Sequence, residues 1–205
     1  MTYKKLSLTF TKIYQAGKCY RIVILLLFFL CSASYAVNPV NSDFRFTHLT
    51  TDNGLSQSNV TSIFQDSKGF IWIGTFNGLN CYNGYEFEVF HYDLNDPYSI
   101  SHNYISAILE DHNGYLWIGT TDGLNRFDRK TRRFKSFKFQ EHDSGSIRDN
   151  QIETIFEDSQ SRLWIGTRNG GLELFNSSSE SFIHHNPDKT KKNSISSNHV
   201  RELFE

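Results

Sequence analysis

The chain has 205 residues, of which 38% are hydrophobic and 15% aromatic, with three prolines and a formal net charge of −1. These values are typical of a globular protein of one or two ordinary domains. The excess of aromatic residues favours strands over helices. The charge disfavours a nucleic acid as partner, because nucleic-acid-binding surfaces need a basic footprint.

Residues 1–36 have the three parts of a secretory signal peptide: a basic part, an apolar part and small residues at the end. The apolar run, residues 22–30, is well short of the roughly 20 residues that a membrane-spanning helix needs. We predict cleavage after Ala36, with an uncleaved anchor as the alternative. Five basic residues and no acid precede this point, so 16 basic and 22 acidic residues remain, and the mature part has a net charge of −6.

Cys19 and Cys31 lie in the predicted signal, which leaves Cys81 as the one cysteine of the mature part. A single cysteine makes neither an intramolecular disulfide nor a metal cage. A reactive nucleophile is one interpretation of Cys81. Its place in a strand pattern beside Tyr82 favours the other, a small residue of the core.

Residues 37–58 lead from the signal to the first repeat. Within them, residues 44–49 (FRFTHL) alternate like a strand but have no hairpin partner nearby in the sequence. We therefore predict a lone strand here, which must pair with a distant part of the fold.

The rest of the chain repeats one unit. The string Trp-Ile-Gly-Thr occurs three times, and its tryptophans are 45 and 47 residues apart. The units span residues 59–98, 103–145 and 150–193, and residues 198–205 open a fourth, within an overall repeat region of 59–205. The repeated positions are Trp72, Trp117 and Trp164; Gly74, Gly119 and Gly166; and Asp66, Asp111 and Asp158.

Each unit predicts four short strands. In the first unit these are residues 60–65, 70–75, 79–82 and 86–92, separated by turns that contain Asp-x-x-Gly and Asn-Gly. Such turns are strong hairpin signals. The spacing of Val60, Ile63 and Phe64 also fits one helical turn, but the segment is too short for a stable helix, and a strand buried on both faces explains it.

Four strands in every 40–50 residues predict an all-β fold built of β-propeller blades. The chain would hold three four-stranded blades and the start of a fourth, an incomplete ring with two unpaired blade edges. The repeated Trp and Ile would pack between blades, and the repeated Gly would leave room for a neighbouring backbone. The lone strand at 44–49 would finish the last blade of a complete ring. We expect this sequence to be the N-terminal part of a longer protein or a truncated gene.

The third unit departs from the pattern at two positions. Ser161 stands where the other units have a turn glycine, which predicts a strained or differently shaped turn. Gly170-Gly171 lengthens the following turn by one residue.

The pattern Asn-x-[Ile/Val]-x-x-Ile-x-x-Asp-x-x-Gly-x-x-Trp-Ile-Gly-Thr-x-x-Gly-Leu resembles the two-component regulator propeller repeat, over essentially all of residues 44–205. The resemblance implies a periplasmic sensor region made of one or two seven-bladed propellers. A β-sandwich domain, an inner-membrane helix and a cytoplasmic histidine kinase or diguanylate cyclase would follow. The implied function is ligand sensing for a two-component-type signalling protein, with no enzyme in the present chain.

Two other functions stay open: a stand-alone exported binding or scaffold propeller, and a carbohydrate-active propeller enzyme. The spacing Asp66-x-x-Gly69-x-x-Trp72 is one residue longer than the Asp box of sialidase-type propellers, and that box is structural. Whether a membrane helix and a kinase or cyclase follow residue 205 would separate the sensor from the stand-alone propeller.

The candidate ligand-binding residues lie in the turns between the second and third strands of each unit, because propeller ligands usually meet loops at the central funnel. These turns vary while the frame around them repeats, as in many binding sites; ordinary hairpin tips are the alternative. The residues are Phe76, Asn77, Thr121, Asp122, Arg168 and Asn169. The expected partners are a small extracytoplasmic ligand, of which a saccharide is one option, and the remaining blades.

No cofactor or metal is expected. Residues 110–114 (EDHNG) lack the ladder of acids that a calcium loop needs. His184 and His185 are adjacent, so they should point to opposite sides of an extended segment. The basic stretch 126–135 could meet an anionic ligand, but it is explained more simply as an outer strand with one solvated face.

Overall fold

The structure is a computed structural model that describes residues 46–205. The predicted signal peptide and residues 37–45 of the lead-in lie outside the described residues. The chain divides into two units, Met1–Thr47 and His48–Glu205, and the second holds every element described below. Among residues 46–205 no helix is long and apolar enough to cross a membrane.

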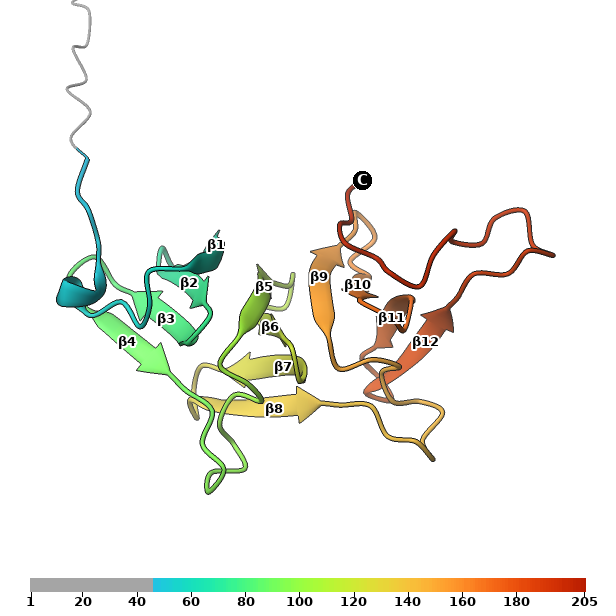
Figure 1. The fold of residues 1–205 in the computed structure, drawn as a ribbon, viewed down its shortest axis with the longest axis horizontal. Coiled ribbons are helices and arrows are strands. Elements are labelled where there is room, and N and C mark those ends of the chain that lie inside the picture. Colours follow the sequence, from blue (N-terminus) through green and yellow to red (C-terminus); the bar gives the residue numbers. More distant parts are fainter. Residues whose placement is uncertain (1–45) are drawn as a thin grey trace, which may run out of the picture. The chain divides into compact units, whose positions relative to one another are not determined.

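The second unit consists of three four-stranded antiparallel sheets, each with its strands in chain order (Figure 1). The first sheet holds β1 (Val60–Gln65), β2 (Ile71–Thr75), β3 (Gly78–Tyr82) and β4 (Phe87–Phe90). The second holds β5 (Ile105–Glu110), β6 (Leu116–Thr120), β7 (Gly123–Asp128) and β8 (Arg133–Phe137). The third holds β9 (Ile152–Glu157), β10 (Leu163–Thr167), β11 (Leu172–Asn176) and β12 (Ser181–His185). The all-β fold of propeller blades in an unclosed ring is therefore confirmed, and we call the sheets blades 1, 2 and 3.

The predicted lone strand at 44–49 stays a prediction, because the last blade of a complete ring, with which it would pair, is not among the described residues. Residues 46–50 pair with no strand and are exposed, and a 3₁₀ turn at Thr51–Asn53 follows them. The physical reason is that an isolated extended segment forms a strand only where it finds a ladder partner. No sheet among residues 46–205 offers one.

A β-bulge explains why the first strand of each blade resembled a helical turn. Within β5, Ile105 pairs with Thr120 and Ala107 with Gly119, so Ser106 is the extra residue of the bulge. A bulge adds one residue to one strand, which turns the spacing of buried positions from two into three. Ile105 and Ile108 are accordingly both buried, three residues apart. The same shift occurs in β1 and β9.

The repeated glycine lets each blade approach the next. A Cβ on Gly119 would lie 2.7 Å from Ile152 Cγ2, and one on Gly74 would lie 2.7 Å from Ile105 Cγ2. Ile105 is fully buried in this contact, whereas its counterpart in blade 1, Val60, is 43% exposed because no described sheet covers it. This packing agrees with the role predicted for the glycine.

The repeated tryptophan meets aromatic residues of the following blade. The ring of Trp72 lies 5.5 Å from that of Phe127, and the ring of Trp117 lies 4.8 Å from that of Phe175, both edge to face. Edge-to-face pairs are a favourable aromatic geometry. Trp72 and Trp117 thus pack between neighbouring blades, as predicted.

The repeated aspartate does more than open the turn. In blade 1, Asp66 Oδ1 accepts hydrogen bonds from the backbone N–H groups of Lys68 and Phe70, both at 2.9 Å. Its other oxygen accepts from the indole Nε1 of Trp72 at 2.8 Å. The same indole bond, at 2.8 Å, recurs at Asp111 with Trp117 and at Asp158 with Trp164.

A glutamate links each of these turns to the next blade. The backbone N–H of Ser67 donates to Glu110 at 2.6 Å, and that of His112 donates to Glu157 at 2.9 Å. Ser159 N–H donates in the same way to Glu205 at 2.6 Å. Residues 198–205 form no strand, yet they contact blade 3 as β5 contacts blade 1.

The first prediction concerns the close approach at Gly119. Gly119→Ala would overpack the junction of blades 2 and 3, and overpacking of this kind costs about 1–3 kcal/mol. We expect a lower urea midpoint, followed by tryptophan fluorescence. Ile152→Leu, which removes the Cγ2 branch, should recover part of the loss in the Gly119→Ala background. An equal loss with and without it would contradict this explanation.

The second prediction concerns Ser161, whose φ of 59° is positive like those of Gly69 (87°) and Gly114 (79°) in the equivalent turns. A left-handed conformation strains a residue that carries a Cβ by about 1–2 kcal/mol. Ser161→Gly should therefore raise the thermal midpoint, and the reverse change, Gly114→Ser, should lower it. Shifts of both variants in the same direction would refute the explanation.

The third prediction concerns acid. Burial opposes ionisation of Asp158, but hydrogen bonds from Trp164 and Arg162 outweigh it and lower the pKa of this carboxyl to about 2. The unfolded value is about 3.9. Because the folded pKa is the lower, the stabilisation is present above pH ~4 and is lost as the pH falls towards 2.

In urea unfolding between pH 5 and 2, Asp158→Asn should therefore show a flatter loss of stability than the unmodified protein. Trp164→Phe removes the indole donor and should bring the folded pKa of Asp158 closer to its unfolded value. The pH range over which this stabilisation is lost should therefore become narrower. Parallel curves for all three proteins would exclude this role of Asp158.

Candidate functional site

All six predicted residues lie in the turns that join β2 to β3, β6 to β7 and β10 to β11. Each turn rests on the loop that leads into the next blade. The N–H of Gly78 donates to Asn103 O and that of Gly123 to Asn150 O, both at 2.7 Å. Gly171 N–H donates to Asn198 O at 2.9 Å. We call these three turns, together with the loops 91–104, 138–151 and 186–199, the turn face.

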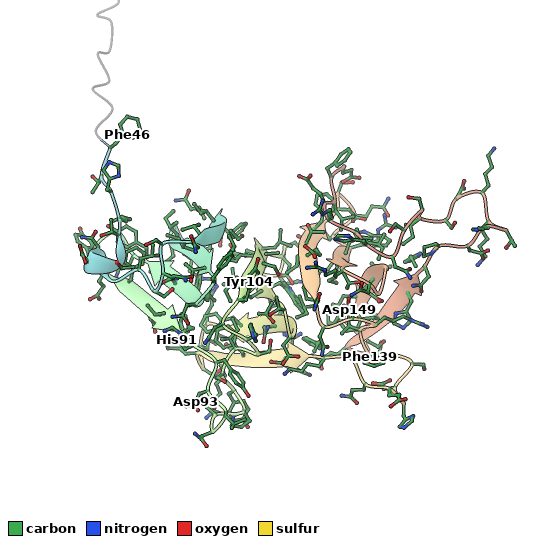
Figure 2. All side chains as sticks on the ribbon, in the orientation of Figure 1. Phe46, His91, Asp93, Tyr104, Phe139 and Asp149 are labelled. Atoms are coloured by element: carbon green, nitrogen blue, oxygen red, sulfur yellow. The ribbon has the colours of Figure 1, made fainter. Side chains whose placement is uncertain are left out.

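In blade 1 the turn face presents an aromatic pair. The ring of Phe76 stacks on that of Tyr104 at 4.8 Å with an angle of 18° between the planes, and Phe76 is 45% exposed. Figure 2 shows Tyr104 on the segment that enters β5. Asn77 is held through its backbone, which donates to Thr75 Oγ1 at 3.0 Å.

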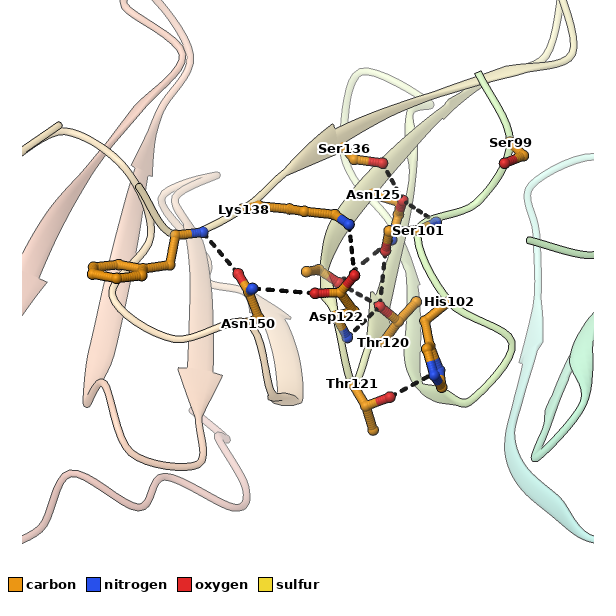
Figure 3. Close-up of polar contacts among 12 residues, drawn as sticks. Ser99, Ser101, His102, Thr120, Thr121, Asp122, Asn125, Ser136, Lys138 and Asn150 are labelled. Atoms are coloured by element: carbon orange, nitrogen blue, oxygen red, sulfur yellow. Dashed lines mark hydrogen bonds and ion pairs between the residues drawn. The ribbon is translucent and has the colours of Figure 1, made fainter. Parts of the chain in front are cut away.

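In blade 2 the turn face presents a charged and hydroxyl-bearing cluster (Figure 3). Asp122 pairs with Lys138 Nζ at 2.6 Å and accepts from Asn150 Nδ2 at 3.2 Å. Thr121 Oγ1 lies 2.9 Å from His102 Nδ1. Lys138 and Asn150 both belong to the loop that leads into blade 3, so this loop fixes the carboxylate of Asp122.

In blade 3 the turn face presents an arginine and nearby carboxylates. The guanidinium of Arg168 lies 3.8 Å from Glu153 Oε1, and His199 Nε2 lies 3.6 Å from the same oxygen. The backbone N–H of Asn169 donates to Asp149 Oδ2 at 2.7 Å. Arg168 is exposed and paired only at long range, so its charge is available to an anionic group.

The structure does not join the six residues directly. Within the described part of the chain, no hydrogen bond or ion pair links one of the six to another; each contacts its own loop. The partners Tyr104, Lys138 and Asn150 were missed by sequence reasoning. Tyr104 and Asn150 lie just before the first strand of the next blade, whereas Lys138 directly follows β8.

Below the turns, a neutral network supports blades 1 and 2. In blade 2, Asn125 Oδ1 accepts from Ser101 N–H at 3.0 Å and Asn125 Nδ2 donates to Ser101 Oγ at 2.8 Å. Ser101 Oγ lies 2.9 Å from Thr120 Oγ1 (Figure 3). Asn80, Ser56 and Thr75 repeat this arrangement in blade 1. In blade 3 the equivalent position holds Glu173 instead of asparagine, a difference that an alignment of the three units shows.

The other candidate chemistries find structural explanations. Cys81 is buried, and burial raises the pKa of its thiol to about 11, which fits a core residue rather than a nucleophile. In the basic stretch, Arg129 pairs with Asp66 at 2.6 Å and Glu110 at 3.0 Å, while Arg126 pairs with Glu180. Across residues 46–205 no group of three His, Cys, Asp or Glu is placed to hold a metal ion.

Three four-stranded blades with a repeated frame and variable turns define the β-propeller fold, with an unclosed ring in the described residues. The model of the two component regulator propeller family matches residues 54–77, 99–122 and 146–169, once in each blade. Three repeats of the chain thus match the model of this family, which confirms the resemblance found in the sequence.

The chain is also similar to several known proteins. The chain is 44% identical over 61 residues to "Histidine kinase P4" of Formosa agariphila, a match that covers 30% of this chain and 4% of that protein. It resembles the extracellular domains of two proteins of B. thetaiotaomicron described as hybrid two component systems, BT3049 and BT4673. For BT3049 the identity is 27% and the TM-score 0.69, with 76% of this chain and 22% of that chain covered.

For BT4673 the identity is 25% and the TM-score 0.64, with coverage of 78% of this chain and 21% of that chain. The chain thus spans about a fifth of each solved domain and a small part of the kinase.

Proposed function

We propose that this chain is an extracytoplasmic, ligand-sensing segment of a two-component-type signalling protein, and that its ligand meets the turn face. The observation that carries this proposal is a contrast within the repeat. Trp-Ile-Gly-Thr is the same in all three blades, while the next residue is Phe76, Thr121 or Arg168. A rigid frame that holds side chains of different chemistry is a common way to build a binding site.

The family and the relatives support the signalling part of the proposal. In this proposal residues 1–36 direct export to the periplasm, and the full-length protein is anchored in the inner membrane. The output would be a histidine kinase or a diguanylate cyclase C-terminal to this chain. The segment itself would bind rather than catalyse, together with the remaining blades.

The chemistry of the turn face suits a small polar ligand such as a saccharide. An exposed ring of Phe76 offers a flat apolar surface, and the Thr121 hydroxyl and Asp122 carboxylate offer hydrogen-bonding groups. Arg168 adds a cation that would favour an acidic group on the ligand. Asp122 is already paired with Lys138, so its charge is not free for acid–base work.

The fourth prediction tests this function in the full-length protein. Asp122→Ala combined with Arg168→Ala should weaken the response to a panel of neutral and acidic oligosaccharides. The expected loss is about tenfold or more in half-maximal concentration, since each truncated polar contact costs ~1 kcal/mol or more.

The matched control, Lys68→Ala with Glu86→Ala, removes the same two charge types from turns at the opposite ends of the strands. It should leave the response unchanged. An unchanged response in the Asp122 and Arg168 variant would refute the turn face as the ligand site.

A further inference from the structure

Blade 3 carries a titratable pair where the other blades carry a neutral network. Glu173 occupies the position of Asn80 and Asn125, and its side chain is fully buried. Its neighbours have changed as well. Arg148 takes the place of Ser101, and the cross-strand partner of Glu173 is His184, where Asn125 faces Ser136.

The pair ties the buried interior of blade 3 to the loop that precedes it. Glu173 Oε1 accepts from the backbone N–H of Arg148 at 3.3 Å, and Glu173 Oε2 is hydrogen-bonded to Nδ1 of His184. The other ring nitrogen, Nε2, lies 2.7 Å from the carbonyl oxygen of Ser144. The imidazole therefore bridges a carboxyl group and a loop carbonyl.

The two hydrogen bonds of this bridge require two protons. A carbonyl only accepts, so Nε2 must carry a proton to bond Ser144 O. The contact between Nδ1 and Glu173 then needs a second proton, held either by the imidazole or by the carboxyl group. If one proton is lost, a nitrogen lone pair faces either the Ser144 oxygen or the Glu173 carboxylate, and one of the two bonds becomes repulsive.

We propose that Glu173 and His184 form a proton-dependent latch that holds residues 140–148 on blade 3 while the pair carries two protons. Loss of one proton breaks the bond to Ser144 or the bond to Glu173 and loosens the loop, which keeps its bond from Phe182 N–H to Gly145 O.

The direction of the pH dependence follows from burial. Burial raises the pKa of the Glu173 carboxyl, although the hydrogen bond from His184 opposes this effect. The folded pair therefore retains its second proton better than an unburied carboxyl would. The latch is closed while the pair holds both protons, and it opens as the pH rises through the apparent pKa at which the pair loses one of them.

Several charged or titratable groups surround the pair and influence its apparent pKa. The Arg148 cation favours loss of a proton, and nearby acids oppose it. The groups that line the two hollows beside His184 are Glu141, His142, Asp143 and Arg148 on one side, and His185, Asp188 and Lys191 on the other.

The equivalent loop of blade 2 provides an internal control. Residues 91–104 are held to β8 by the bond from Phe134 N–H to Tyr98 O at 2.8 Å, and residues 138–151 are held to β12 by the bond from Phe182 N–H to Gly145 O at 2.9 Å. The loops thus share this contact, but the imidazole bridge is found only in the second.

The latch reaches the turn face, because the same loop carries Lys138 and Asn150, which hold Asp122. An effect of pH on ligand binding through this route rests on the proposed function. The latch itself does not, so the two can fail separately.

The test is hydrogen–deuterium exchange of the full-length protein between pH 5.5 and 8.0, corrected for the intrinsic pH dependence of exchange. Peptides covering residues 140–148 should lose protection by about tenfold as the pH rises, the scale of one charge-assisted hydrogen bond. Peptides covering residues 93–101 should not change.

Two variants make the test specific. The triple change Arg148→Ser, Glu173→Asn and His184→Ser rebuilds the network of blade 2 and should abolish the pH dependence. His184→Gln, which removes the titratable ring alone, should do the same and covers the case in which the triple variant does not fold. A pH dependence that persists in a folded variant, or that is equal in both loops of the unmodified protein, would overturn the latch.

Discussion

The hydrogen bond from each repeated tryptophan to the repeated aspartate is the interaction on which the blades depend. Asp66 uses one oxygen to close the β1–β2 turn and the other to fix the indole of Trp72. The oriented indole then packs on Phe127 of the next blade. Because the same turn also donates to Glu110, one carboxylate controls both the shape of a blade and its contact with the following blade.

Much of this architecture could be predicted from the sequence, because the distance between repeated motifs gives the length of one blade. Trp-Ile-Gly-Thr and the turn residues were sufficient to predict the strands and their grouping into blades. The bond between Asp66 and Trp72 was missed, since it depends on which face of β2 the indole occupies. The bulge at Ser106 was missed because it appears only when two strands are placed in register. The strand expected at residues 44–49 stays a prediction, because its expected partner, the last blade of a complete ring, is not among the described residues.

The candidate site likewise has parts that the sequence predicts and parts that it does not. The turns that carry Phe76, Asp122 and Arg168 were located correctly, because Asn-Gly and Asp-Gly signals mark them. The partners of Phe76 and Asp122 lie 16–28 residues further along the chain, in segments that lead into the next blade. Such partners follow from the contact between blades, which the sequence of a single unit does not contain. The partner of Arg168, Glu153, lies in β9 of the same blade.

Blade 3 keeps the frame but changes its interior, and this contrast separates structural from functional requirements. Trp164 keeps its hydrogen bond to Asp158, and Gly166 keeps its close approach to the following segment, so the repeated frame does not explain Glu173. A buried carboxyl group is destabilising unless it is hydrogen-bonded, and a neutral asparagine serves the same position in blades 1 and 2. The fold therefore does not need a titratable group there. The exchange makes physical sense if the proton itself is used, and the bridge from Glu173 through His184 to Ser144 gives that proton a defined mechanical effect.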